Sequence, residues 1–435
     1  MIIYKFGGVS VKDAEAIKNI SKIIGEVNEP LTVVVSAIDN STNLLEEIID
    51  AHYSEKANVK LLLEDLKQKH LTLILDLFDK FPKNLLTKIQ NLFSEMEARV
   101  VKPFSQSFNY EYDQMIAYGE LLSTTIVSAY FNHIGQKNMW VDIRTCLDAD
   151  DKYRDANIIW DSSEEKAKNI FKPDANHLFI TQGFIASDSK GNACSLGREG
   201  SDYTAAILAY LLDAEKMIIW KDVLGVLNAD PDYFSNTTKL DLIPYHEAIE
   251  LSYYGASVIH PKTIKPLQAK EIPLWVKSFI KPKEEGTLIT KGDLPQPLLP
   301  NFIVKKQQVL ISIKSHNFSF IGENDLFFVF SLINKYGVKL NFTQNTAVSF
   351  VFCVNHSFRF IEGLIDDLKL KYDVEREDGL ELITVRHYSP DTLAEITENH
   401  QILIEQKNKN TAIFLSQGTQ EIPLEDCCCL QEKRQ

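Results

Sequence analysis

The strongest constraint on the fold is a series of short apolar runs, rich in Val and Ile, that alternate with stretches of helical periodicity over residues 1–300. Continuous apolar runs are typical of strands buried on both faces, as in a helix-covered parallel sheet. The pattern therefore predicts an α/β domain, a helix–sheet–helix sandwich with a mainly parallel central sheet. The expected strands are 2–6, 31–37, 139–144, 177–186, 216–222 and 273–278, and the expected helices are 11–28, 42–67, 84–98, 113–134, 201–213 and 245–257.

Two segments interrupt this alternation and organise the chain. Residues of about 50–105 carry apolar side chains at helical spacing, which predicts an inserted helical pair. The proline-rich stretch 281–300 is the expected linker. We therefore expect a first domain over 1–295 and a smaller α+β module over 300–420, built from one copy or from two divergent copies of a βαβ-type unit.

Composition excludes several classes of function. The formal net charge of −14 argues against nonspecific nucleic-acid binding, which needs clustered Lys and Arg. No apolar run has the length of a membrane span, and the first residues lack the pattern of a secretion signal. The six cysteines lack paired metal-binding spacing, and the triplet Cys427–Cys429 suits neither a zinc site nor a disulfide framework. We expect a cytoplasmic protein with no nucleic-acid or membrane partner.

The first candidate site is the turn KFGGVS, where a predicted strand ends and a helical pattern begins. Glycines let the backbone approach a ligand closely, and a helix N-terminus offers free N–H groups to anions. Gly7 and Gly8 would thus form a phosphate-binding turn, with Lys5 supplying a positive charge. By itself, a Gly-Gly turn after a strand is more often a plain turn than a ligand site.

The second candidate site, SLGREGSD at 195–202, repeats this arrangement in front of another apolar helix. Arg198 can bind a carboxylate or phosphate through two parallel hydrogen bonds. Asp202 could either cap the helix or pair with Lys5. Two anion-binding turns in one α/β domain favour a functional interpretation over a structural one.

Isolated polar residues beside apolar segments are weaker candidates. Ser36 follows a predicted buried strand, at the sheet edge where ligands of open α/β sheets bind. We interpret Thr42 as a helix cap assisted by Glu46, with substrate contact as the alternative. Glu120 is either a surface residue or a carboxylate that binds an ammonium group. His260 is interpreted as structural.

Taken together, these stretches resemble the aspartate kinases of the amino-acid-kinase family, in order and in spacing. The similarity covers residues 1–280, and the last third resembles the family's ACT regulatory domains loosely. It rests on the blocks KFGGVSV, VVVSAIDNSTNLLEE, DQMIAYGELLS, WVDIR, FITQGFIA, SLGREGSDYTAAILA, KDVLGVLNADP and EAIELSYYGASVIHP. The resemblance implies the amino-acid-kinase fold and transfer of the γ-phosphoryl group of ATP to the side-chain carboxylate of L-aspartate, a step toward lysine, threonine and methionine.

The same resemblance implies roles for individual residues. Lys5 would stabilise the transferring phosphoryl group, and Asp202 would hold Lys5 in place. Mg²⁺ would enter with ATP, and no side chain is assigned to it. The acceptor would contact Thr42, Glu120, Phe184, Arg198 and Ser201, and the nucleotide would contact Gly7, Gly8, Ser36, Gly200, Lys221, Asp222 and Ser257.

Three positions depart from the family pattern. Lys221 stands where members often have Thr, and Ser257 stands where many have a Lys near the ATP phosphates. Our hypothesis is that Lys221 restores the lost positive charge. Glu199 replaces a glycine of the family's Gly-Arg-Gly-Gly turn, and we expect its side chain to point outward.

The regulatory region departs further. Asn341, Gln344 and Asn345 offer neutral amides where lysine-inhibited members tend to have an acidic residue and small hydroxyl residues. We therefore expect either an amino-acid effector other than lysine or a module that only dimerises. A homodimer or a higher homo-oligomer is the expected assembly.

Two alternative functions remain. One is another family member with a glutamate-type acceptor, which the combination of Thr42, Glu120 and Arg198 disfavours. The other is a catalytically silent ACT-type amino-acid sensor. The presence of Lys5 and Asp202 together with Arg198 argues against a silent protein.

Overall fold

A computed structural model describes residues 1–55, 58–80, 82–103, 107–173, 177–234, 236–256, 259–316, 319–356 and 358–417. Within these residues the chain forms two compact units, and each is described by itself. The first comprises 1–226, 239–252 and 257–295. The second takes up the chain from 296 onward, together with the short segments 227–238 and 253–256. Ser257 and the triplet Cys427–Cys429 lie outside the described residues.

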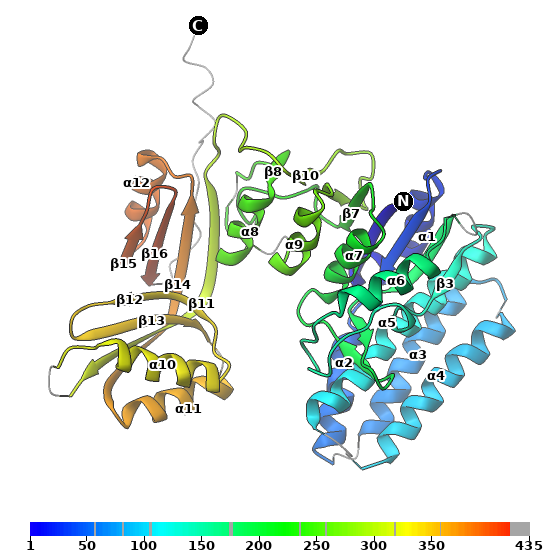
Figure 1. Ribbon diagram of the computed structural model, residues 1–435, viewed down its shortest axis with the longest axis horizontal. Coiled ribbons are helices and arrows are strands. Elements are labelled where there is room, and N and C mark those ends of the chain that lie inside the picture. Colours follow the sequence, from blue (N-terminus) through cyan, green and yellow to red (C-terminus); the bar gives the residue numbers. More distant parts are fainter. Residues whose placement is uncertain are drawn as a thin grey trace, which may run out of the picture. The chain divides into compact units, whose positions relative to one another are not determined.

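The first unit is built on an eight-stranded sheet in which all neighbouring strands are parallel except β9 and β10 (Figure 1). Every residue of β2 and β4 is buried, and because successive side chains point to opposite faces, both faces of the sheet are covered. The predicted mainly parallel sheet between helical layers is confirmed. The strand order is β3 (Met139–Val141), β4 (Leu178–Gln182), β2 (Leu31–Val35), β1 (Ile2–Phe6), β7 (Lys216–Lys221), β9 (Leu274–Ser278), β10 (Thr287–Thr290), β8 (Leu242–Pro244).

Helices cover this sheet, and two of them position most of the candidate site. Helix α5 packs against β2, β3 and β4, whereas α7 packs against β1, β2 and β7. A short hairpin of β5 (Ile185–Ser187) and β6 (Ala193–Ser195) precedes α7. The helices are α1 (Ala14–Gly25), α2 (Ser41–Tyr53), α3 (Val59–Leu77), α4 (Lys83–Val101), α5 (Phe108–His133), α6 (Trp160–Ile170), α7 (Gly200–Leu211), α8 (Tyr245–Tyr254) and α9 (Pro261–Ala269).

The helical insertion is present as α3 and α4, which run side by side next to α5 (Figure 1). The prediction of one helix over 42–67 is wrong, because α2 ends at Tyr53 and α3 begins at Val59. Glu55 has a φ of 53°, a left-handed conformation that breaks the helical path. The polar run Ser54–Glu55 marks this break, and the prediction of a single helix passed over it.

The expected linker also contains regular structure. Thr287–Thr290 form β10, which pairs with β8 in parallel and with β9 in antiparallel register. The sequence pattern also did not predict β8, α6 or α9. These elements are short, and the strands are two of the outermost in the sheet order, where periodicity is weak.

The second unit is an antiparallel six-stranded sheet with helices, in agreement with the predicted α+β module. Its two long strands, β11 (Asn301–Ser315) and β14 (Tyr372–Arg386), lie side by side, and a register shift between Lys305 and Leu310 divides their pairing. The remaining elements are α10 (Glu323–Lys335), β12 (Leu340–Asn345), β13 (Ser349–Asn355), α11 (Phe358–Lys369), α12 (Pro390–Asn399), β15 (Ile402–Lys407) and β16 (Thr411–Gln417).

Helices pack against this sheet at two apolar cores, and a third apolar cluster of Phe342, Cys353, Leu380, Leu382 and Leu415 includes strands of both halves. One half packs α10 and α11 against β11 and β13 through residues such as Val329, Leu364 and Phe352. The other half packs α12 against β14 and β16, and Phe234 from the segment 227–238 completes it. The module therefore consists of two halves of unequal construction, which explains why no repeat is visible in the sequence.

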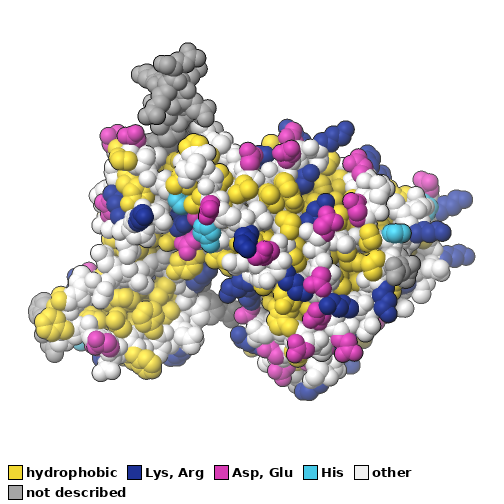
Figure 2. Space-filling view, turned by 45° about the horizontal axis from the view of Figure 1, so that its top comes forward, with side chains coloured by type: hydrophobic (Ala, Val, Ile, Leu, Met, Phe, Trp, Pro, Cys, Tyr) yellow, Lys and Arg dark blue, Asp and Glu magenta, His cyan; other side chains and the backbone are white. Residues whose placement is uncertain are grey.

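Charged side chains of both signs are mixed on the surface of the protein. On the face shown in Figure 2, Lys and Arg side chains are interspersed with Asp and Glu side chains. Interspersed charges of both signs are typical of solvated surface rather than of a track for a phosphate backbone. No helix among the described residues has the length and apolarity needed to cross a membrane.

One buried titratable group makes the helical insertion sensitive to pH. The imidazole of His70 on α3 is fully buried, packs edge-on against Phe93 of α4, and uses Nδ1 to contact the carbonyl oxygen of Leu66. Burial lowers the pKa of His70 to about 4, because charging it would remove an ion from water. The folded chain therefore holds His70 neutral.

We expect acid to destabilise the wild-type chain more than a His70→Leu variant. The unfolded imidazole takes up a proton below its ordinary pKa of 6.5, whereas the folded one resists until about 4, so stability falls as pH falls through that window. Between pH 7 and pH 5 the difference amounts to about 2 kcal/mol. Urea unfolding of both proteins at each pH measures it, and parallel pH dependences would contradict the assignment.

Candidate active site

A cleft of about 540 Å³ lies in the first unit at the carboxyl ends of the parallel strands. Such edges are the usual ligand sites of open α/β sheets. Most of the predicted site residues line it, although they come from distant parts of the chain. These are Lys5, Gly8, Ser36, Thr42, Glu120, Phe184, Arg198, Gly200, Ser201, Asp202 and Lys221.

The first glycine turn passes close to neighbouring backbone. Strand β1 ends at Phe6 and a 3₁₀ turn, Gly8–Val11, follows directly. A Cβ on Gly8 would lie 3.0 Å from the carbonyl oxygen of Ala37, so a side chain here would push the two turns apart. Gly7 does not line the cleft itself, but a Cβ there would lie 3.4 Å from the Lys5 ammonium nitrogen. The turn therefore leaves space around Lys5.

Lys5 and Asp202 form the central ion pair of the cleft. Their Nζ and Oδ1 atoms are 2.6 Å apart, and only 12% and 5% of the two side chains are exposed. Lys5 lies on β1, and Asp202 lies in the first turn of α7. Of the two interpretations of Asp202, the structure therefore contains the pairing with Lys5. This pair joins the two glycine-containing turns.

The second turn is tightly packed against the end of β4. A Cβ on Gly200 would lie 2.6 Å from the Phe184 ring, and a Cβ on Gly183 would lie 2.4 Å from that of Ser201. Phe184 has a φ of 70°, and its N–H donates a hydrogen bond of 2.9 Å to Thr204 Oγ1. These contacts explain why the turn is rich in glycine and why Phe184 reaches the cleft.

Glu199 corrects one expectation. It was predicted to point outward, but its side chain lines the cleft, and its Oε2 is buried with no hydrogen-bond partner. Glu199 also adopts a φ of 53° as the residue before α7. The direction of the Glu199 side chain depends on this left-handed backbone conformation, which the sequence of the turn does not report.

Glu120 is a buried carboxylate that lines the cleft. It is 4% exposed, and its Oε1 accepts a weak hydrogen bond of 3.4 Å from the N–H of Ala37. Its Oε2 is buried and has no hydrogen-bond partner. Burial raises the pKa of Glu120 to about 8, and the nearby Lys5 charge opposes this shift. The surface interpretation of Glu120 is therefore wrong, and one of its carboxyl oxygens has no partner within the described protein.

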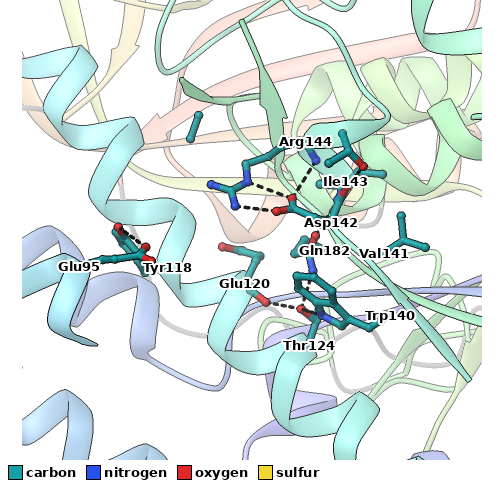
Figure 3. Close-up of polar contacts among 12 residues, drawn as sticks. Glu95, Tyr118, Glu120, Thr124, Trp140, Val141, Asp142, Ile143, Arg144 and Gln182 are labelled. Atoms are coloured by element: carbon teal, nitrogen blue, oxygen red, sulfur yellow. Dashed lines mark hydrogen bonds and ion pairs between the residues drawn. The ribbon is translucent and has the colours of Figure 1, made fainter. Parts of the chain in front are cut away.

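A buried polar network fixes the part of α5 that carries Glu120 (Figure 3). Thr124 lies one turn after Glu120 and donates to its carbonyl oxygen at 2.8 Å. The same hydroxyl accepts from Gln182 Nε2 at 2.7 Å and from Trp140 Nε1 at 3.0 Å. Gln182 Oε1 in turn accepts from the N–H of Ile143 at 2.8 Å. These bonds tie α5 to β3 and β4 and so set the rotation of the helix.

Thr42 is not a helix cap. Helix α2 begins at Ser41 after Asn40, and Thr42 lies inside its first turn and lines the cleft. Glu46 does not assist capping, because it accepts a hydrogen bond from the Tyr112 hydroxyl. The neighbouring Ser36 is held by Ser123 of α5, whose hydroxyl donates to its carbonyl oxygen at 2.7 Å.

Three further residues were predicted to contact the nucleotide, and among those that the structure describes only Lys221 lines the cleft. Lys221 ends β7 and lines the cleft. Asp222 follows it, is exposed and does not belong to the cleft lining. Ser257 lies outside the described residues. Among the residues that the structure describes, no group of three or more His, Cys, Asp or Glu side chains is arranged to hold a metal ion.

Several lining residues were not predicted. They are Ala37, Asp39, Tyr112, Arg154, Ser195 and Gly197. Tyr112 precedes Glu120 by eight residues on α5, a spacing that returns to the same helix face, so helical periodicity could have indicated it. The loop residue Arg154 had no such signal, because its place depends on tertiary contacts.

The amide residues of the second unit are only partly available to an effector. Asn341 Oδ1 accepts from Lys305 Nζ at 2.9 Å, and its Nδ2 donates to Gln308 and Asn355 at 2.8 Å each. Asn341 therefore already uses its amide within the sheet. Gln344 and Asn345 are exposed at the end of β12.

Comparison with known proteins identifies the family. A sequence profile described as the Amino acid kinase family matches residues 1–278, and the chain belongs to this family. The lysine-sensitive aspartokinase 3 of Escherichia coli is 28% identical over 397 residues, which cover 88% of this chain and 86% of that protein. The chloroplastic aspartokinase 1 of Arabidopsis thaliana is 29% identical over 395 residues, covering 88% and 68%.

Solved structures extend this similarity to nearly the full length of the chain. The crystal structure of E. coli aspartokinase III in complex with aspartate and ADP matches with a TM-score of 0.82 and 26% identity, covering 96% of both chains. The complex of the same enzyme with lysine and aspartate matches with a TM-score of 0.81, covering 95% of both. Aspartate kinase from Clostridium acetobutylicum shares the fold, with a TM-score of 0.76 at 21% identity.

Proposed function

We propose that this protein is an aspartate kinase, which transfers the γ-phosphoryl group of ATP to the side-chain carboxylate of L-aspartate and forms 4-phospho-L-aspartate. The observation that carries the proposal is one cleft that contains the Lys5–Asp202 pair, the buried carboxylate of Glu120 and the guanidinium of Arg198. The named aspartokinases to which the chain is similar support it. This reaction is a step toward lysine, threonine and methionine.

The chemistry requires positioning and charge neutralisation rather than a covalent nucleophile. The side-chain carboxylate of aspartate is ionised at neutral pH, so no general base is needed. In our proposal Lys5 faces the transferring phosphoryl group and stabilises its charge. Asp202 holds the Lys5 ammonium at 2.6 Å and so fixes its position before substrate binds.

The acceptor end recognises the amino-acid part of aspartate. Glu120 presents a buried carboxylate oxygen with no other partner, which suits the substrate ammonium group. Arg198 is exposed in the cleft and suits the α-carboxylate through two parallel hydrogen bonds. Thr42, Phe184 and Ser201 complete this end of the cleft.

ATP would lie along the other end of the cleft. Gly7, Gly8 and Gly200 allow close backbone approach to phosphates, and the start of α7 presents free N–H groups. Ser36 and Lys221 line the same region, and we assign Asp222 and Ser257 to the nucleotide from the family resemblance. Mg²⁺, bound with ATP, would neutralise phosphate charge.

We also propose a cytoplasmic homodimer or higher homo-oligomer, in which the second unit serves regulation or assembly. An E. coli relative is described as lysine-sensitive. In this chain Asn341 is committed to the sheet, and no charged residue replaces it among the three amide positions, so lysine is a poor candidate effector. A glutamate-type acceptor or a silent sensor remains as the competing function.

The function is tested first with ATP, L-aspartate and hydroxylamine, and hydroxamate formation is expected. L-Glutamate in place of L-aspartate should react poorly. Hydroxamate from glutamate but not from aspartate would favour the glutamate-type kinase. A folded chain that forms neither would favour the sensor.

Lys5→Ala is expected to lower kcat by about 100-fold or more, since it removes the charge that faces the phosphoryl group. It also leaves Asp202 buried and unpaired, so the variant should be less stable as well. The double variant Lys5→Met, Asp202→Asn removes both charges and should fold while remaining inactive. Lys18→Ala, a partly exposed lysine on α1 that does not line the cleft, is the control. Wild-type turnover in the double variant would contradict the role of Lys5.

Lys221→Ala is expected to raise the KM for ATP about 10-fold, while the KM for aspartate changes less than about twofold. The reason is the hypothesis that Lys221 supplies a charge to the ATP phosphates. Lys216→Ala is the matched control, because Lys216 begins the same strand β7 and lies away from the cleft lining. Equal effects on the two KM values would contradict the hypothesis.

Aspartate affinity is expected to rise with pH between 6 and 8, by at most about tenfold per unit. Below its raised pKa of about 8, Glu120 of the free protein holds a proton, which must leave before the carboxylate can bind an ammonium group. Calorimetric Kd values across this range measure the slope, with proton release detected in buffers of different ionisation enthalpy. Glu120→Gln should bind weakly with a flat profile, and a slope equal to that of the wild type would exclude Glu120 as its origin.

A further inference from the structure

Arg154 is a cationic side chain of the cleft to which the sequence assigned no role. Its guanidinium carbon lies 4.2 Å from the centre of the Tyr112 ring, and the residue lines the cleft. The described residues provide no carboxylate that forms an ion pair with this guanidinium. A planar cation that is stacked on an aromatic ring keeps its five N–H donors directed outward for an anionic ligand.

The backbone at Arg154 is held in an unfavourable conformation by a buried carboxylate. Its φ is 72°, which costs a residue with a Cβ about 1–2 kcal/mol. Asp113 is fully buried, and its Oδ2 accepts from the N–H of Arg154 at 2.9 Å. Strain that the surrounding structure maintains in this way is concentrated at functional sites.

The same carboxylate ties Arg154 to the turn that carries Arg198. Asp113 also accepts from the N–H of Ser195 at 2.7 Å and from its hydroxyl at 2.6 Å. The N–H of Ala156 donates to the carbonyl oxygen of Ser195 at 3.0 Å. The segments 154–156 and 195–197 thus run side by side, and both arginines line the same cleft.

Tyr112 places Arg154 at the acceptor end. Tyr112 and Glu120 lie on the same face of α5, about 12 Å apart along the helix axis. The hydroxyl of Tyr112 is bound by Glu46, one turn after Thr42 on α2, so the ring is fixed beside another acceptor-end residue. Asp113 and Tyr112 therefore link Arg154 to the turn of Arg198 and to the helix that carries Thr42.

We propose that Arg154 is a specificity-determining residue that binds the α-carboxylate of the amino-acid acceptor together with Arg198. The inference rests on the proposed aspartate kinase activity. A carboxylate offers about four acceptor positions, and one bidentate arginine uses two of them. Arg154 takes the remaining positions, while the side-chain carboxylate of the acceptor faces Lys5.

The test variant is Arg154→Gly, because glycine adopts a φ of 72° without strain and the protein should fold at least as well as the wild type. We expect the KM for L-aspartate to rise about 10-fold or more, as for loss of hydrogen bonds to a charged group, with the KM for ATP within about twofold. Arg154→Lys should give an intermediate KM for aspartate, since it keeps the charge without the planar donors.

A second ligand makes the test specific to the α-carboxylate. L-Isoasparagine retains the side-chain carboxylate of aspartate but carries an uncharged amide in place of the α-carboxylate. The wild type should prefer aspartate strongly, and Arg154→Gly should reduce this preference about fivefold or more. An unchanged preference, or a rise in the KM for ATP instead, would overturn the proposal.

Arg144→Ala is the matched control. Arg144 also belongs to the first unit, in a short 3₁₀ helix, but Asp142 binds its guanidinium through two hydrogen bonds of 3.0 and 2.6 Å, as Figure 3 shows. It does not line the cleft, so both KM values should stay within about twofold of the wild type. A loss in Arg144→Ala equal to that in Arg154→Gly would indicate a general effect of removing an arginine and overturn the assignment.

Calorimetric binding of L-aspartate separates this inference from the proposed function. A wild-type chain that binds aspartate but forms no hydroxamate would overturn the kinase activity and leave the comparison of Arg154 variants valid as a binding measurement. A wild-type chain that forms hydroxamate while Arg154→Gly binds aspartate with unchanged Kd would overturn only the role of Arg154. A chain that does neither would overturn both.

Discussion

The ion pair between Lys5 and Asp202 is the interaction on which the cleft depends. Both groups are nearly buried, and removing them from water is costly unless each keeps its partner. The pair therefore requires the end of β1 and the start of α7 to lie close together. Gly8, Gly183 and Gly200 stand where neighbouring groups come too close for a Cβ. A parallel sheet makes this geometry available, because the turns after its strands all emerge at one edge.

Helix α5 is the second organising element. Its polar residues Asp113, Ser123 and Thr124 are buried, and each is hydrogen-bonded to a loop or strand that forms the cleft. Glu120 differs, since one of its oxygens has no partner and its pKa is raised by burial. A buried acceptor left without a partner is unfavourable in the free protein, and a bound ammonium group would relieve it. The helix thus supports the cleft through satisfied hydrogen bonds and offers one carboxyl group, that of Glu120, for binding.

The second unit is built around an antiparallel sheet with several apolar cores rather than around a ligand cleft. Its two halves share the long strands β11 and β14, yet α10 and α11 pack in the core of one half and α12 packs in the core of the other. The amide of Asn341 forms hydrogen bonds with Lys305 and Gln308 of this sheet, so these groups already occupy its donor and acceptor. Amino-acid sensing of the kind found in the lysine-sensitive relative would therefore need other residues here.

The sequence by itself determined the parallel sheet, the helical insertion, the two glycine turns and most of the polar residues that line the cleft, because periodicity and glycine spacing report local structure directly. It did not determine the break at Glu55, strand β10, the inward position of Glu199 or the role of Thr42, since these depend on backbone conformation and on pairing between distant segments. Arg154 is the clearest case. The buried carboxylate of Asp113 and the hydrogen bond from Ala156 to Ser195 hold its loop beside the turn of Arg198, and no local pattern reports contacts between residues about 40 positions apart.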